Sequence, residues 1–297
     1  MNPIRGLFSM LMALGILLLL AGYFGRLHGA FDSLAALRVQ MAVAFGVACL
    51  FAVAFGALTA RALAVTGLVI AGWGIVPIMI GQTPVPRGDV VLYNQNLRWD
   101  NGDLDSVAAA IRESGADVVT LQEVSSRTMP IMEMLKRDYI YQAFCEFSTG
   151  VGGVAILSKL PSRGEAGCAR GLGLVWMDIR PQGRRNFRAV SIHLSWPWPH
   201  RQPDHVDRLM PHLAAIEQPM IIAGDFNMAP WGHSVAQIAE ASGTDLVRGL
   251  RLTLDKPEFW PGLPIDHVLV DRGGVADVEM LEKSGSDHHA LLARVFF

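Results

Sequence analysis

The sequence predicts an α/β domain built from two stacked β-sheets with helices outside, preceded by a membrane region of three helices. The chain has 297 residues, of which only 18% are charged, whereas roughly a quarter are charged in soluble globular proteins. The few charges are unevenly spread, because residues 1–86 hold four Lys/Arg and one acid, Asp32. After residue 86, strand-like runs outnumber helical runs, which favours two packed sheets over one doubly wound sheet.

Three long apolar runs form the membrane region. They cover residues 7–24, 39–58 and 62–82, and at about 1.5 Å per residue each can cross a ~30 Å hydrocarbon core as a helix. We interpret the first run as a retained anchor, not a cleaved signal peptide, because its core is long and two further runs follow it. No run carries an internal acid or base, which argues against a channel or a transporter.

The number of spans determines on which side of the membrane the rest of the chain lies. Three spans put it opposite the amino terminus, and Arg5 before the first span favours a cytoplasmic amino terminus. The domain would then be extracytoplasmic, although Lys and Arg are almost evenly divided between the two sides. The segment 81–89, GQTPVPRGD, is typical of a short stiff linker. We therefore expect a membrane region at 1–86 and a soluble domain at 87–297.

Charge and cysteine content limit what the soluble domain can be. Residues after 86 include 21 basic and 26 acidic side chains, a formal charge of −5, which disfavours a strong salt-dependent grip on nucleic acid. Cys49 falls in an apolar run, so only Cys145 and Cys168 can pair in the domain. A disulfide framework is excluded, and one bridge or none is expected.

The elements of the soluble domain follow in a regular order. A β-branched run ending in amides predicts the first strand at 89–97, and the next helix begins at Asp103 or Asp105 and ends at Gly115. The basic run 183–188 is expected to be a hairpin turn. Helices are expected at about 129–137, 203–216 and 232–241. Apolar runs predict the other strands at 116–124, 139–144, 151–158, 172–179, 187–194, 219–227, 265–271 and 289–297.

Polar residues stand at the ends of these apolar strands. Such residues tend to meet at one rim of a sheet, and a group of carboxylates, amides and histidines without cysteine suits Mg²⁺ or Mn²⁺ better than structural zinc. A site of this kind matches phosphoryl chemistry, in which a metal offsets charge on phosphate oxygens and a side chain activates water. The residues are Asn94 or Asn96, Glu123, His193, Asp225, Asn227, Asp266, Asp287 and His288.

The same segments resemble a known family. Residues 89–297 contain, in order, NQN, LQEV, GVAILS, SIHL, GDFN, IDHVLV and GSDHH, an order similar to that of the endonuclease/exonuclease/phosphatase superfamily of metal-dependent phosphodiesterases. The resemblance implies a four-layer α/β sandwich, with two packed sheets flanked by helices. The membrane region resembles a bacterial subgroup that joins three spans to this domain, which implies an integral protein of a bacterial inner membrane.

The resemblance also implies which residues hold the metal. Glu123 of LQEV would be the principal ligand, with Asn96 beside it on the metal or the phosphate and Asn94 as the competing amide. Asp287 of GSDHH matches the second carboxylate near the metal.

Catalytic roles follow from the same comparison. Asp225 would orient or deprotonate the attacking water, and Asn227 would bind a phosphate oxygen. His288 would be the catalytic imidazole, with Asp266 accepting its other N–H. His193 would contact the scissile phosphate or protonate the leaving oxygen.

Five other residues are less easily assigned. His267 and His289 are expected to face away from the site, because side chains alternate along a strand. Glu146 is a weak counterpart of an acid that some family nucleases carry, and Arg98 is a plausible phosphate contact together with Arg201.

The substrate is the open question. Trp196 and Trp198 follow His193 and could stack on bases, grip a lipid, lie at the bilayer interface or simply pack within a proline-rich loop. We expect a membrane-anchored Mg²⁺-dependent hydrolase of a lipid or prenyl phosphate, with Mn²⁺ as an alternative metal. A tethered nuclease on DNA or RNA is the first alternative, and an inactive binding or scaffold protein is the second. No protein partner is inferred.

Overall fold

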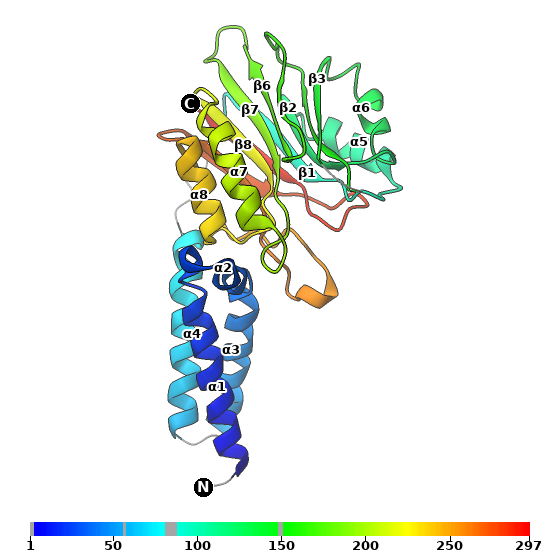
Figure 1. Cartoon of the computed structure of the whole chain (residues 1–297). Helices are drawn as coiled ribbons and strands as arrows, with labels where there is room; N and C mark the ends of the chain where they lie inside the picture. Colours follow the sequence, from blue (N-terminus) through cyan, green and yellow to red (C-terminus); the bar gives the residue numbers. More distant parts are fainter. Residues whose placement is uncertain (1–2, 56–57, 81–87, 148–150) are drawn as a thin grey trace.

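The computed structural model describes residues 3–55, 58–80, 88–147 and 151–297, and it shows a helical bundle on one side of an α/β domain (Figure 1). The bundle contains α1 (Pro3–Ala21), α3 (Arg38–Phe55) and α4 (Leu58–Met79). Between α1 and α3 lie a short 3-10 helix, η1 (Gly25–Leu27), and α2 (Gly29–Ala36), which sits between the bundle and the domain.

Two to three of these helices are long and apolar enough to cross a membrane. Among the described residues, Ile4–Ala21 and Leu58–Met79 meet this description separately, and α2 with α3 would be a third span bent by 56°. The runs expected at 7–24, 39–58 and 62–82 overlap α1, α3 and α4. The boundary expected near residue 86, and most of the linker 81–89, lie outside the described residues.

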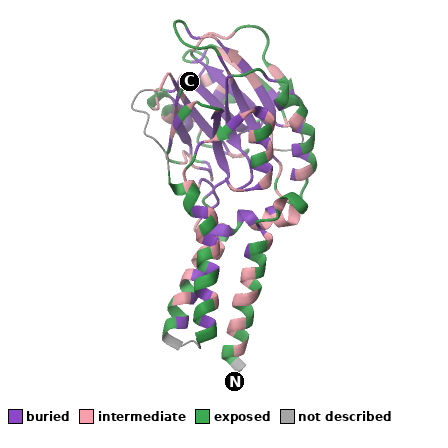
Figure 2. Cartoon of the chain, turned by 90° about the vertical axis from the view of Figure 1, so that its left-hand side faces the viewer, coloured by how far each residue is buried: buried purple, intermediate pink, exposed green. Residues whose placement is uncertain are grey.

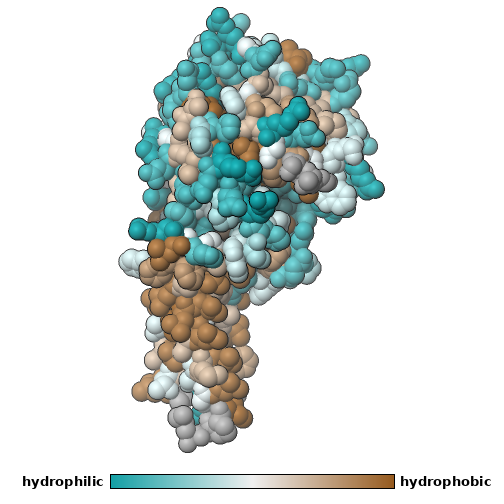
Figure 3. Space-filling model, in the orientation of Figure 1, coloured by the Kyte–Doolittle hydropathy of each residue, from teal (hydrophilic) through white to brown (hydrophobic). Residues whose placement is uncertain are grey.

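The bundle exposes its apolar side chains. Leu50 is 73% exposed, Val69 63% and Trp73 78%, and Figure 3 shows an apolar surface that ends where the domain begins. Ala60 and Ala64 are fully buried where the helices meet, as expected for small residues that allow close helix packing. An apolar outer surface over a small-residue interior is the arrangement that lipid, not water, would solvate.

The strands of the described residues form two mixed six-stranded sheets. The first has the order β11-β12-β1-β2-β4-β3 and the second β5-β6-β7-β8-β10-β9. Their bounds are β1 (Val90–Asn96), β2 (Val118–Val124), β3 (Tyr141–Glu146), β4 (Gly153–Ser158), β5 (Gly167–Ala169), β6 (Leu174–Ile179), β7 (Phe187–His193), β8 (Met220–Asp225), β9 (Thr244–Leu246), β10 (Asp266–Asp271), β11 (Val275–Met280) and β12 (Leu291–Phe296).

Helices cover the outer face of each sheet. Between the sheets lies an apolar cluster that includes Leu92, Ile156 and Ile221. Figure 2 shows the strands of the two sheets as the buried centre of the domain. On the outside, α5 (Leu104–Glu113) and α6 (Pro130–Met134) pack on the first sheet, and α7 (Gln202–Ala214) and α8 (His233–Ser242) pack on the second. The expected four-layer sandwich is confirmed.

Most differences from the expected elements are at sheet edges. The sequence reading missed β5, β9 and β11, which are short or largely exposed, so their apolar pattern is weak. A further 3-10 helix, η2 (Pro257–Phe259), lies in the loop before β10. Of the two expected caps of α5, Asp103 accepts the N–H of Ser106 at 3.2 Å. The turn expected at 183–188 joins the antiparallel strands β6 and β7.

A disulfide links the two sheets. Cys145 of β3 is bonded to Cys168 of β5, with Cα atoms 5.5 Å apart. The sequence left this pairing open.

The domain is held to the bundle through α2. The carboxylate of Asp32 accepts hydrogen bonds from the His233 N–H at 2.6 Å, the Ser234 N–H at 3.0 Å and the Ser234 hydroxyl at 2.7 Å. Because the N-cap of α8 is Gly232, which has no side chain to offer, Asp32 caps this helix from another element. The Trp231 indole also donates to the Ala35 carbonyl at 2.7 Å.

Candidate active site

Strand ends from both sheets meet at one rim. Asn96 ends β1 in the first sheet, whereas His193 and Asp225 end the parallel strands β7 and β8 in the second and pair with each other in register. Asp266 begins the antiparallel strand β10 and pairs with Asp225. Gly224 permits this alignment, because a Cβ there would collide with the Ile192 carbonyl of β7.

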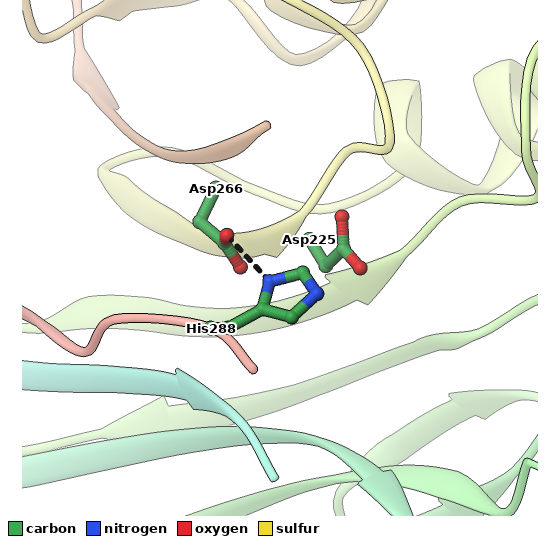
Figure 4. A group of neighbouring side chains, drawn as sticks. All are labelled: Asp225, Asp266 and His288. Carbon is green, nitrogen blue, oxygen red and sulfur yellow. Dashed lines mark hydrogen bonds and ion pairs between the residues drawn. The ribbon is translucent and has the colours of Figure 1, made fainter. Parts of the chain in front are cut away.

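We call His193, Asp225, Asp266 and His288 the buried half of the site. His288 Nδ1 lies 2.8 Å from Asp266 Oδ2, and its other ring nitrogen faces Asp225 (Figure 4). Ligand atoms of Asp225, Asp266 and His288 all lie within 4.8 Å of one another. His193 Nε2 is 3.5 Å from Asp225 Oδ2, and all four residues are at most 5% exposed.

The electrostatics of the buried half separate its two histidines. Burial disfavours a charged His288, but the carboxylates of Asp266, Asp225 and Asp287 outweigh it and raise the pKa to about 10. Burial, together with the charge of His288, lowers the pKa of His193 to about 3. Burial also raises the pKa of Asp225, as does the neighbouring Asp266. At neutral pH, His288 is therefore the protonated ring and His193 the neutral one.

We call Glu123, Lys256 and Asp287 the open half of the site. Glu123 Oε2 accepts the Trp99 N–H at 2.7 Å, and Asp287 Oδ2 lies 2.7 Å from Lys256 Nζ. Burial raises the pKa of Glu123, although hydrogen bonds from Asn96 and Trp99 oppose this. Asn96 connects the halves, since its Nδ2 donates to Glu123 Oε1 at 3.1 Å and to Asp225 Oδ2 at 2.9 Å.

Backbone strain is concentrated around the same rim. Arg98, Glu123 and Asn227 have φ values of 60°, 55° and 47°, in the left-handed region that side chains other than glycine rarely occupy. Glu123 lies where the pairing of β2 with β4 shifts register between Leu121 and Val124, which turns its side chain out of the strand alternation. Strain of this kind persists where the surroundings hold a functional geometry.

A cleft of about 590 Å³ opens above these groups. Asn96, His193 and Asp266 are not among the residues that line it. Its lining includes Arg98, Glu123, Asp225, Asn227, Lys256, Asp287 and His288.

Other residues that the sequence singled out lie elsewhere. Asn94 is buried between the sheets, where its Oδ1 accepts from Thr120 and Gln122 at 2.9 Å, so Asn96 and not Asn94 is at the site. His267 and His289 bond the carbonyls of Met228 and Leu281 at 2.7 and 2.8 Å, away from the cleft as expected.

The remaining sequence candidates flank the cleft. Glu146 is exposed and lines a separate pocket, and Arg201 lines a neighbouring pocket. Trp196 lines the cleft and stacks on Phe259 with ring centroids 6.0 Å apart. Trp198 packs against His28 of the bundle side, with ring centroids also 6.0 Å apart.

Sequence reasoning missed two groups at the site. Lys256 lies in an irregular loop, where no strand or helix period marks it. The Trp99 N–H is a backbone donor, which no residue type can reveal. Ser286 was part of a quoted motif without a role; its hydroxyl donates to the Asn96 carbonyl at 2.7 Å and accepts the His288 N–H at 3.0 Å.

The donor set fits a hard divalent cation. Carboxylates and an amide converge on one cleft without cysteine, and Asp266 Oδ1 has no hydrogen-bond partner in the described structure although it is buried. Mg²⁺ prefers oxygen ligands and keeps several waters. The ligand atoms of Asp225, Asp266 and His288 are also close enough together to hold a metal ion, but the His288 ring is already bonded to Asp266. This group differs from the expected metal ligands, which are Asn96, Glu123 and Asp287.

Comparisons with known proteins agree with this geometry. Residues 91–288 match the model of the Endonuclease/Exonuclease/phosphatase family. An endonuclease/exonuclease/phosphatase from Beutenbergia cavernae has a similar fold, with a TM-score of 0.58, 17% identity and coverage of 71% of this chain and 72% of that chain. No curated protein sequence matches the chain.

Two further solved structures have the same fold. A mutant beta toxin from Staphylococcus aureus with bound magnesium ions has a TM-score of 0.54 and 15% identity, over 69% of this chain and 99% of that one. Sphingomyelinase C from Streptomyces griseocarneus has a TM-score of 0.51 and 15% identity, over 70% and 99%. The family match spans most of the chain and contains the buried Asp225, Asp266 and His288, so the chain belongs to the endonuclease/exonuclease/phosphatase family of metal-dependent phosphoester hydrolases.

Proposed function

We propose that this chain is a membrane-anchored, Mg²⁺-dependent phosphodiesterase or phosphatase that hydrolyses the phosphate ester of a lipid or prenyl phosphate head group, with Mn²⁺ as an alternative metal. The anchor in this proposal is the helical bundle, inserted as three spans like the bacterial subgroup that the sequence resembles. One observation carries the substrate class: loops next to the site are hydrogen-bonded to the bundle, which lies at one end of the domain (Figure 1).

Chain connectivity supports this orientation. His193 ends β7, and five residues later the Trp198 carbonyl accepts a hydrogen bond from Ser33 of α2 at 2.8 Å. Five extended residues span at most about 18 Å, so the site lies close to the bundle.

A second loop leads to the same conclusion. Gln40 of α3 donates to the carbonyls of Phe259 and Gly262 at 2.9 and 2.8 Å, close in sequence to Lys256 at the cleft. A phosphate at the surface of a surrounding bilayer would therefore meet the cleft without leaving the membrane.

In this proposal, Glu123, Asp287 and Asn96 would hold the metal. A bound divalent cation would offset negative charge on the phosphate oxygens. Lys256 now pairs with Asp287, and it would release this carboxylate to the metal and turn to the phosphate.

The buried half would handle the proton. Asp225 orients the attacking water and accepts its proton, for which a raised pKa suits a base. His288, protonated and held by Asp266, donates to a phosphate oxygen and stabilises the charge that develops there.

Two more residues complete the substrate contacts. Asn227 lines the cleft, and one amide hydrogen is engaged by the Leu194 carbonyl at 2.8 Å, which leaves the other for a phosphate oxygen. His193 is neutral, because burial lowers its pKa to about 3. Of the two roles expected for His193, contact with the scissile phosphate fits a neutral ring better than protonation of the leaving oxygen.

The proposed location is extracytoplasmic, in a bacterial inner membrane. The bridge between Cys145 and Cys168 supports this side, because disulfides persist in oxidising compartments and are rare in the cytosol. Cells lysed with a thiol-blocking maleimide should yield protein that gains further labels at Cys145 and Cys168 only after reduction. Complete labelling before reduction would contradict this location.

The decisive experiment uses the full-length protein in detergent micelles with Mg²⁺ or with EDTA. We expect Mg²⁺-dependent product release from phospholipids or prenyl phosphates, and none from His288→Ala. Cleavage of DNA or RNA alone would replace this proposal with the tethered nuclease. Absence of turnover on the whole panel would favour the inactive scaffold.

A further inference from the structure

A second pocket lies between the bundle and the domain, and it shares no lining residue with the catalytic cleft. It has a volume of about 460 Å³. Its wall combines the ends of bundle helices with the loop before α8, and it contains none of the residues assigned above to metal binding or catalysis. The lining includes Tyr23, Arg26, Asp32, Arg38, Trp73 and Trp231.

Arg38 is the unusual residue in this pocket. It is 3% exposed, and its guanidinium lies 4.1 Å from the centroid of the Tyr23 ring and 5.1 Å from that of Trp231. Within the described residues it makes one hydrogen bond, a long one of 3.5 Å to the Gly22 carbonyl, and no ion pair. A guanidinium carries five N–H donors, and a buried charge without an anionic partner is strongly unfavourable.

The acid in the pocket does not neutralise Arg38. The two carboxylate oxygens of Asp32 accept hydrogen bonds from three donors of His233 and Ser234. Among the described residues, no ion pair within 4 Å joins Asp32 to Arg38. Two of these donors are backbone N–H groups at the start of α8, so Asp32 also caps the amino terminus of that helix. The unmet requirement at this pocket is therefore an anion for Arg38.

The pocket offers a second cation and space for a ligand. Arg26 of η1 is exposed, lines the pocket and has no hydrogen-bond or ion-pair partner in the part of the chain that the structure describes. Gly74 of α4 leaves room for the guanidinium of Arg38, because a Cβ there would collide with it. Two guanidinium groups beside one cavity suit a phosphate, which they can bind through paired N–H donors.

The position of the pocket indicates what carries the phosphate. Its lining joins the ends of bundle helices to the loop before α8. Figure 3 shows that the apolar surface of the bundle ends where the polar surface of the domain begins, which is the level of lipid head groups in a membrane-anchored chain. Trp73, 78% exposed on α4, lines the pocket and is suited to the interface between lipid and water.

We propose that this pocket binds the phosphate of an anionic phospholipid, held by Arg38 and Arg26, as a site separate from the catalytic cleft. The proposal rests on the membrane anchoring proposed above and is independent of the catalytic assignment. Occupancy supplies the buried guanidinium with its counter-charge and joins bundle, lipid and domain at one point.

The test is native mass spectrometry of the full-length protein in detergent micelles supplied with phosphatidylglycerol, phosphatidylcholine or inorganic phosphate. All variants carry His288→Ala, so that no lipid is consumed. We expect one phosphatidylglycerol to be retained, at least tenfold less retention in Arg38→Gln, and a several-fold loss in Arg26→Gln. Phosphatidylcholine should be retained at least tenfold less than phosphatidylglycerol.

Arg61→Gln is the matched control. Arg61 belongs to the same bundle, but its guanidinium donates to the Ala52 and Val53 carbonyls at 2.9 Å, near the turn between α3 and α4. This variant should retain the lipid as the parent does.

Several outcomes would overturn the proposal. Equal retention by Arg38→Gln and its parent would make Arg38 a purely structural residue. If Arg38→Gln does not fold, unchanged retention by Arg26→Gln would overturn it instead, because the Arg26 side chain has no hydrogen bond or ion pair to lose among the described residues. Displacement of the lipid by millimolar inorganic phosphate would assign the pocket to the free ion. Failure of the catalytic proposal leaves these readings unchanged, because hydrolysis is not measured.

Discussion

The buried half and the open half of the site both contain carboxylates, but these carboxylates lie in different surroundings. In the buried half, Asp266 is 1% exposed and its one bonded oxygen holds the His288 ring at 2.8 Å. In the open half, Asp287 meets Lys256, whose side chain is 37% exposed. One half is thus fixed by packing and the other by a partner that can move.

This difference separates two tasks that both need carboxylates. Proton transfer requires a ring held in one orientation, which a buried carboxylate provides. Metal binding requires oxygens that can exchange a partner for a hydrated cation, which a partly exposed carboxylate at the cleft provides. The comparison predicts that variants in the two halves fail in different ways.

The largest effect is expected for Glu123→Gln in the open half. Without the metal, the transition state loses several kcal/mol of stabilisation of its negative charge, so turnover should fall by about 10³-fold or more. Steady-state assays across a Mg²⁺ titration would measure this, and excess Mg²⁺ should restore little. The exposed Glu146→Gln is the matched control, and near-normal turnover of Glu123→Gln would break the comparison.

In the buried half, Asp266→Asn should lower turnover by about 10²–10³-fold, because the amide no longer favours the protonated His288 ring or fixes its tautomer. The Mg²⁺ concentration for half-maximal rate should stay within about twofold, since the open half is intact. Asp271→Asn, at the other end of β10, serves as control. A shifted Mg²⁺ requirement with intact turnover would show that the halves are not separate.

A smaller effect is expected for Lys256→Met. Removing the ammonium that pairs with Asp287 leaves this carboxylate to the metal, so the Mg²⁺ concentration for half-maximal rate should fall several-fold. Lys283→Met removes a similar pair, 2.9 Å from Asp255, and should leave the Mg²⁺ requirement unchanged. A higher requirement in Lys256→Met would mean that the lysine helps to hold the metal.

The smallest effect concerns His205, a buried histidine that, unlike His288, has no carboxylate partner. His205 bonds the Ser195 N–H and the Leu172 carbonyl at 3.0 Å, without a carboxylate, and burial lowers its pKa. The unfolded chain then binds the proton more tightly, so stability is full above pH 6.5 and falls as the pH drops below it, by at most about 1.4 kcal/mol per pH unit.

Thermal unfolding of the full-length protein in detergent between pH 7.5 and 5 would measure this effect. The exposed His212→Asn should keep the pH dependence, whereas His205→Asn should reduce it. An unchanged slope in His205→Asn would show that other groups cause the loss of stability.

The order of polar strand ends in the sequence was enough to predict the sandwich and the rim. Polar residues that end apolar runs stand out in the sequence, so Glu123, His193, Asp225 and Asp266 could be named in advance, and the family resemblance suggested their roles. Lys256 could not, because loop geometry has no period. Nor could the docking of Asp32, because a lone acid among apolar residues says nothing about the helix it caps 201 residues further on.

That cap has a consequence for the proposed enzyme. Three hydrogen bonds to Asp32 and one from Trp231 prevent the domain from tilting freely over the bundle. If the bundle spans a membrane as proposed, the cleft would stand at a fixed height above the bilayer. Only esters that project from the bilayer by that distance would then reach Asp225 and His288, so the height of the cleft would select head groups by their length.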